Sequence, residues 1–168
     1  MEYLVLVFLH VFFGIIWAGG AVATGLFIVP SVIEAGPPGG AVMAGVVKRR
    51  FPIVMTISAI IVVLAGARLY MLRFSPEWLT TAQGLVLTLG AILGLGAFVL
   101  GVFIQRPLIG RMGALAAQIA TSGRPPTPDQ STELQAMRGR LKKIAALTAW
   151  HLLGASALMS VQRLAASL

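Results

Sequence analysis

The sequence has no cysteine, and only 11% of its 168 residues are charged. Without cysteine the chain can form no disulfide, no thiolate metal site and no cysteine nucleophile. A soluble domain carries about a quarter charged residues, so this chain has too few polar side chains to cover a surface that faces water. Because 58% of its residues are hydrophobic, we expect lipid to be its main solvent.

Several motifs of soluble enzymes are also missing. The sequence has no phosphate-binding glycine loop followed by lysine, no nucleophile elbow and no metalloprotease histidine pair. Its net charge of +8 could indicate a nucleic-acid partner. Lysine and arginine, however, also collect on the cytoplasmic loops of membrane proteins, where they face anionic lipid. We therefore predict a bilayer with an anionic inner leaflet as the partner, and no nucleic acid.

Four apolar segments reach the length of about 20 residues that a helix needs to cross a bilayer. They cover residues 3–29, 53–72, 82–104 and 144–161. Pro30 is expected to end the first segment, which we expect to be a retained span because no basic stretch precedes it as in a signal peptide. The sequence thus predicts one all-α domain, residues 1–168, folded as a four-transmembrane-helix bundle.

The positions of the cations predict the orientation of the bundle. Of the thirteen lysines and arginines, three lie in the first connection and seven in the third. Since basic loops stay in the cytoplasm, both termini are predicted outside. Residues 106–143 are predicted to form a helical cytoplasmic hairpin, in which Thr127, Pro128 and Gln130 fit a capping box at the start of a helix that runs to about Ala166.

Ionisable side chains inside a membrane are costly, so each is a candidate functional residue. Both histidines, His10 and His151, fall in predicted spans, and Arg68 and Arg73 lie near the outer end of the second span. At 1.5 Å per residue the histidines are about 12 and 18 Å deep, an offset of roughly 6 Å that helix tilt can absorb. Because imidazole is an axial ligand of haem iron, we predict a b-type haem between them, with the arginines near its propionates and Met159 as an alternative ligand.

Blander interpretations of the same residues stay open. A histidine in a membrane can simply bond to a neighbouring helix, and an arginine can reach the interface with its long side chain. The glycines of the first and third spans either let helices pack closely or leave room for a flat cofactor. Copper is the competing cofactor, because methionine and histidine bind Cu(I), although the seven methionines are dispersed.

The stretch LHVFFGIIWAGG, which begins at Leu9, and the later LFIVP resemble the opening helix of the CopD-like superfamily of bacterial membrane proteins. That grouping includes the copper-resistance D proteins, and the HemJ-type protoporphyrinogen oxidases are similar in the same helix. The resemblance covers about the first 70 residues. It implies a bacterial inner (plasma) membrane protein whose His10 contacts haem or porphyrin, and Trp17 belongs to the same motif. HemJ-type proteins also use a lysine in a later span, and no predicted span here contains one.

Three functions follow as predictions. The first is electron transfer or haem handling by a haem or porphyrin bound between the helices. The second is a non-catalytic accessory or structural role in a homo-oligomer or a larger membrane complex. The third is transport of copper or another small solute.

Overall fold

The computed structural model describes residues 1–162, and every regular element in that part of the chain is helical. The first half consists of α1 (Glu2–Val22), the π-helical segment η1 (Ala23–Ile28), α2 (Val29–Glu34), α3 (Pro37–Lys48) and α4 (Phe51–Met71). The second half consists of α5 (Pro76–Leu79), α6 (Ala82–Val99), the π-helical segment η2 (Leu100–Gln105), α7 (Arg106–Ser122) and α8 (Pro128–Val161). The prediction of an all-α fold is confirmed.

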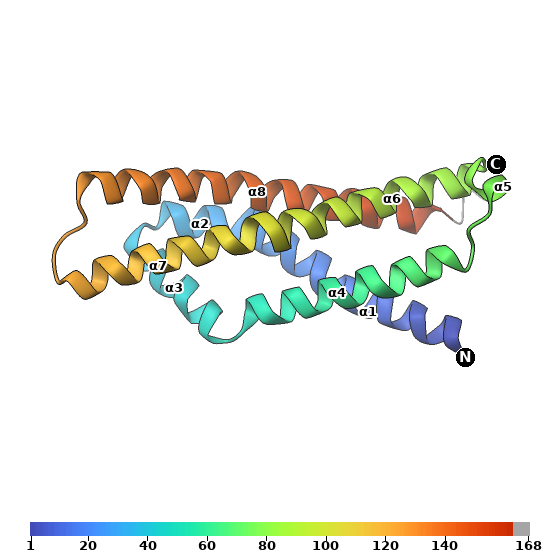
Figure 1. The fold of residues 1–168 in the computed structure, drawn as a ribbon, viewed down its shortest axis with the longest axis horizontal. Coiled ribbons are helices and arrows are strands. Elements are labelled where there is room, and N and C mark those ends of the chain that lie inside the picture. Colours follow the sequence, from blue (N-terminus) through green and yellow to red (C-terminus); the bar gives the residue numbers. More distant parts are fainter. Residues whose placement is uncertain (163–168) are drawn as a thin grey trace.

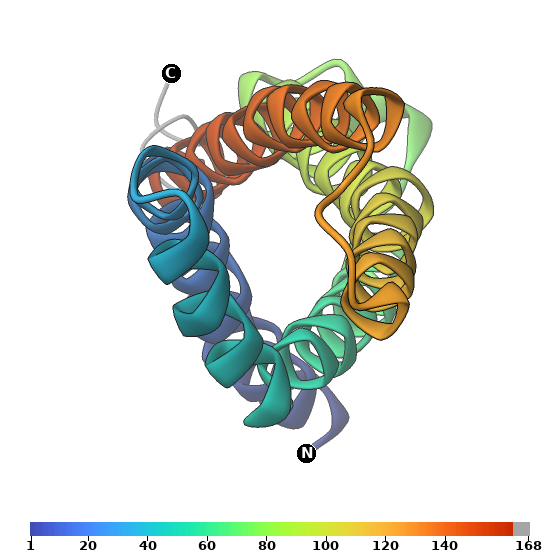
Figure 2. The same cartoon turned by 90° about the vertical axis from the view of Figure 1, so that its left-hand side faces the viewer.

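Four continuous helical rods in the described part of the chain are long and apolar enough to cross a membrane, as predicted. They cover Glu2–Glu34, Phe51–Met71, Ala82–Ser122 and Pro128–Val161. In Figure 1 they run along one long axis, with the N-terminus, α5 and the end of α8 at one end and the α7–α8 turn at the other. Figure 2 shows them as a ring in the order α1, α8, α6, α4. Which end faces the cytoplasm stays a prediction.

One apolar cluster joins all four rods in the middle of the ring. Its buried members are Trp17, Ala59, Val62, Ala97 and Leu152. In lipid, helices associate through close packing rather than through exclusion from water. This cluster therefore contributes to holding the ring together.

Glycines bring neighbouring rods close to one another. A Cβ on Gly20 of α1 would lie 2.6 Å from the Sδ of Met55 on α4. A Cβ on Gly25 in η1 would collide with the backbone of Ala145 on α8. The contact of Gly25 with backbone leaves no room for a side chain, whereas the flexible Met55 side chain could move away from a Cβ on Gly20. Gly25 is therefore a packing residue, as interpreted from the sequence.

The prediction that Pro30 ends the first rod is wrong, because the helix continues to Glu34. A proline has no N–H to donate, and its ring crowds the preceding helical turn. Here η1 widens the helix just before the proline, and the Val29 N–H donates to the carbonyl of Thr24, five residues back. The third rod repeats this arrangement at η2, directly before Pro107. Both prolines are thus accommodated by a π-helical turn.

The connection between α4 and α6 is fixed by local contacts. Ser75 caps α5, and its Oγ accepts the N–H of Trp78 at 3.1 Å. Hydrogen bonds from its own backbone N–H and from Ser75 lower the pKa of the exposed Glu77 carboxyl. The ring of Trp78 packs edge-on against Tyr70, whose Oη lies 2.8 Å from the Oγ1 of Thr88 on α6. These contacts hold the start of α6 beside the end of α4.

The α7–α8 hairpin is ordered by its caps and by a second apolar core. Gly123, at φ +65°, ends α7. Thr127 and Gln130 form the predicted capping box, with N–O distances of 3.0 and 3.3 Å, and α8 begins at Pro128. The predicted helix end near Ala166 lies outside the described residues. The second core contains Val29, Leu108, Met137, Leu141 and Ala145.

Candidate intramembrane histidine site

His10 lies on α1 with its ring against α4. Its Nδ1 is 2.9 Å from the carbonyl oxygen of Val62. A carbonyl oxygen can only accept a hydrogen bond, so Nδ1 carries the proton and, in the neutral ring, Nε2 keeps a free lone pair. Gly66, one turn further along α4, leaves room for the imidazole, because a Cβ there would come within 2.7 Å of its Cε1. This tautomer is the one in which a histidine offers Nε2 to a metal.

His151 lies on α8 in a similar arrangement with α6. Its Nδ1 is 2.9 Å from the carbonyl oxygen of Leu147, one turn earlier in the same helix. Its ring packs against Gly96, where a Cβ would lie 3.1 Å from the imidazole Cδ2. As for His10, Nδ1 is the donor and Nε2 is left as a possible ligand atom. Both histidines therefore share one tautomer and one kind of neighbour.

The two histidines belong to different helix pairs. His10 is level with Val62 and Gly66 on α4. His151 is level with Gly96 on α6. Residue counts along α4 and α6 have no common origin, so the axial offset of roughly 6 Å expected from the sequence stays a prediction.

The other predicted site residues have structural contacts. Trp17 is 6% exposed and belongs to the central cluster. Met159 packs against α6 near the terminal end of the bundle, where a Cβ on Gly90 would lie 3.2 Å from its Cγ. Both residues thus fill space between helices.

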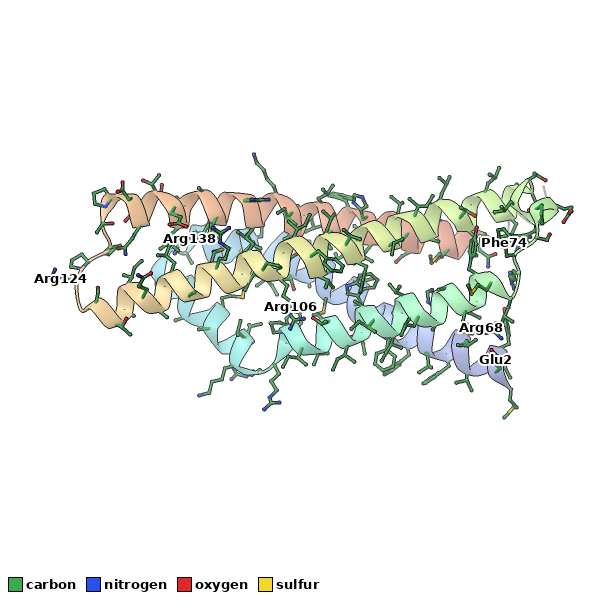
Figure 3. All side chains as sticks on the ribbon, in the orientation of Figure 1. Glu2, Arg68, Phe74, Arg106, Arg124 and Arg138 are labelled. Carbon is green, nitrogen blue, oxygen red and sulfur yellow. The ribbon has the colours of Figure 1, made fainter. Side chains whose placement is uncertain are left out.

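Arg68 and Arg73 lie at the terminal end of the bundle, as expected, and both reach across to the first turn of α1. The Nε of Arg68 donates to the Oε1 of Glu2 at 2.7 Å, with 49% and 59% of the two side chains exposed. The Nη2 of Arg73 donates to the Oη of Tyr3 at 3.0 Å. Figure 3 shows Arg68 and Glu2 beside one another at this end. A cofactor with acidic side groups would have to share these arginines with α1.

Two glycines on inward faces have open space beside them. Gly14 follows His10 by four residues and precedes Trp17 by three, so it lies on the face of α1 that points into the bundle. Gly94 likewise precedes the buried Ala97 on α6 by three residues, so it also lies on an inward face. A Cβ on either glycine would meet nothing within 4 Å. Each is twelve residues from the start of its helix, about 18 Å deep.

Among the residues that the structure describes, no three His, Asp or Glu side chains gather in a group that could hold a metal ion. A ligand site here would consist of single imidazoles. The sequence indicated both histidines but not their partners, because the Val62 carbonyl carries no signal in the sequence. The pairing of each histidine with a glycine on the neighbouring helix also depends on helix register.

Comparison of the chain with models of known protein families, with curated proteins and with solved structures gives no match. The resemblance to the CopD-like superfamily therefore stays a prediction.

Proposed function

We propose that this protein is an integral membrane protein that binds one haem b or a related porphyrin inside its helix bundle, with His10 as the axial ligand. The observation that carries the proposal is the hydrogen bond from His10 Nδ1 to the Val62 carbonyl, which leaves Nε2 available. A ligating histidine commonly has its other nitrogen fixed in this way, because the bond orients the ring and raises its basicity.

The unfilled space beside Gly14 and Gly94 supports the same proposal. A flat macrocycle needs a helix surface without side chains, and each of these two glycines lies on the inward face of its helix with open space beside it. Gly14 is one turn from His10, so a ring bound by His10 would lie next to it. The Nδ1 of His151 bonds within its own helix, whereas that of His10 bonds to a neighbouring helix, so we take His10 as the ligand.

Arg68 and Arg73 support a particular orientation of the macrocycle. Arg68 follows Gly66, which packs against His10, by two residues, and its side chain is only half-exposed. One haem propionate could replace Glu2 as the partner of Arg68, and the other could replace Tyr3 as the partner of Arg73. Bound haem would supply one-electron chemistry, and the chain's own residues would orient it and exclude water.

The test uses the protein purified in detergent, incubated with haem and examined by reduced-minus-oxidised absorbance spectroscopy. The proposal predicts Soret and alpha bands and one haem per chain in a titration. Metal analysis of the same sample tests for copper, the rival cofactor. Copper at one equivalent per chain with no haem bands would replace the proposal with a copper site.

A second candidate function is an accessory subunit of a membrane complex. The ordered α7–α8 hairpin favours it, because this part of the chain packs with α2 in a second apolar core and carries several exposed cations. Figure 3 shows Arg106, Arg124 and Arg138 on this part of the chain. Blue-native electrophoresis after mild solubilisation tests this role, and migration as a lone small species would contradict it.

A further inference from the structure

The first connection contains a helix, although its cations predict a basic loop. Helix α3 (Pro37–Lys48) has the sequence PPGGAVMAGVVK, in which Lys48 is the only charged residue. Val42 and Val47 are nevertheless 61% and 46% exposed. A helix that is apolar all round is normally covered by protein or by lipid.

An apolar groove of about 340 Å³ lies between α3 and the η1–α2 segment. Phe27, Ile28, Val32 and Val42 line it, and its one polar side chain, Ser31, donates to the carbonyl of Phe27 in its own helix at 2.8 Å. The groove therefore presents carbon atoms and no unpaired hydroxyl group. Gly39 also lines the groove, and it lets α3 approach the backbone of Val32 directly.

Three cations stand at the end of α3, where the chain turns into the membrane-length helix α4. Lys48, Arg49 and Arg50 are all exposed, and Arg50 adopts φ +62° at the turn. The Nη1 of Arg49 donates to the carbonyl of Gly45, so its guanidinium lies back along α3. Neither ion pair found in the described residues involves any of the three.

The position of α3 agrees with a lipid interface. At 12 residues it is about 18 Å long, too short to cross a hydrocarbon core of about 30 Å. Figures 1 and 2 show it beside the bundle at the start of α4, with its outer side uncovered by other helices. Helices with an apolar surface and basic residues lie in the plane of the headgroups, where cations attract anionic lipid.

We propose that α3 lies in the headgroup region of an anionic leaflet, with a phospholipid acyl chain in the groove between α2 and α3 and phosphate groups at Lys48, Arg49 and Arg50. The occupant is lipid rather than protein because the cations sit where a membrane-length helix begins. This site is separate from the histidines and does not depend on a bound cofactor.

The absence of cysteine gives a clean background for a depth measurement. Spin labels are placed singly by Val42→Cys on α3, Leu89→Cys on the exposed face of α6 and Gln118→Cys on α7. The protein is reconstituted in phosphatidylglycerol vesicles and, separately, in phosphatidylcholine vesicles. Collision rates with oxygen, which concentrates in lipid, and with a nickel chelate, which stays in water, are then measured.

The proposal predicts an oxygen-to-nickel ratio at Val42 several-fold above that at Gln118 and closer to that at Leu89 in phosphatidylglycerol. The ratio should fall in phosphatidylcholine and on combined substitution of Lys48→Gln, Arg49→Gln and Arg50→Gln. A Val42 label as open to nickel as the Gln118 label would overturn the proposal. A label shielded from both reagents would also overturn it, because a second copy of the chain would then cover α3. An unchanged ratio in both vesicles would overturn the role of the cations.

Discussion

The Nδ1 of His10 on α1 and the carbonyl oxygen of Val62 on α4 are 2.9 Å apart. The two residues are 52 positions apart in the sequence, so this contact joins two different helices and fixes the direction of the imidazole. It also decides which ring nitrogen is free. The expected chemistry of the site follows from this one relationship.

The glycine under the His10 ring should be sensitive to substitution. Gly66→Ala places a Cβ 2.7 Å from the imidazole Cε1, so the ring or α4 must move. We expect a loss of about 1–3 kcal/mol in the free energy of unfolding, as for other overpacked cores. Thermal unfolding in detergent, followed by the loss of monodisperse protein, measures it.

Gly14→Ala is the matched control for this substitution, because a Cβ at that position meets nothing within 4 Å. It should leave stability unchanged or slightly higher. Equal destabilisation by both substitutions would show that the helices are arranged differently around His10.

The open space beside Gly14 should be needed by the macrocycle but not by the fold. Gly14→Leu is expected to fill this space and to abolish haem binding while the protein stays folded. Gly113→Leu on α7, which also has nothing within 4 Å, should bind haem normally. Haem titration followed at the Soret band measures both variants. Normal binding by Gly14→Leu would place the macrocycle elsewhere.

The Arg68–Glu2 ion pair should contribute little to stability. Both side chains are about half exposed, and exposed pairs contribute about 0–1 kcal/mol. Glu2→Gln should therefore change the unfolding midpoint only slightly, whereas Arg68→Gln should also weaken haem binding by removing a partner for a propionate. A double-mutant cycle on stability and on haem affinity separates the two effects. Equal haem affinity of Arg68→Gln and the native chain would exclude the propionate contact.

Local signals in the sequence were sufficient for some parts of this structure. The apolar runs indicated four long helices, and the Thr127–Gln130 pattern located the start of α8, because capping depends on neighbouring residues only. Pro30 predicts a helix end that the structure does not have, since a π-helical turn can absorb a proline without any clear signal in the sequence. Helix α3 was missed because its short apolar stretch follows Gly36 and two prolines, which favour a loop.

The candidate site could be predicted only in part for a similar reason. Histidines within apolar segments are visible in the sequence, and both were found. Their depth depends on how α1 is registered against α4 and how α8 is registered against α6, which is set by contacts such as Gly66 with His10 and Gly96 with His151. Those contacts join residues more than 50 positions apart, so this register cannot be predicted from residue counts along a single segment.

The capping box of α8 should hold the hairpin turn in place. Thr127→Ala removes the hydroxyl that accepts the Gln130 N–H and should cost about 1 kcal/mol at the start of α8. Hydrogen exchange should become faster within residues 128–132, with no change in residues 144–161. The control is Thr121→Ala, whose hydroxyl bonds only within α7. Exchange that rises equally in both variants would mean that the cap has no specific role.

The most direct test of the central claim is a haem titration of His10→Ala and His151→Ala beside the native chain, with absorbance as the readout. We predict that His10→Ala loses the Soret shift and regains it when free imidazole is added, because the cavity left by the side chain can admit the missing ligand. His151→Ala should retain the native spectrum. A native spectrum in His10→Ala, or no spectrum in the native chain itself, would contradict ligation of haem by His10.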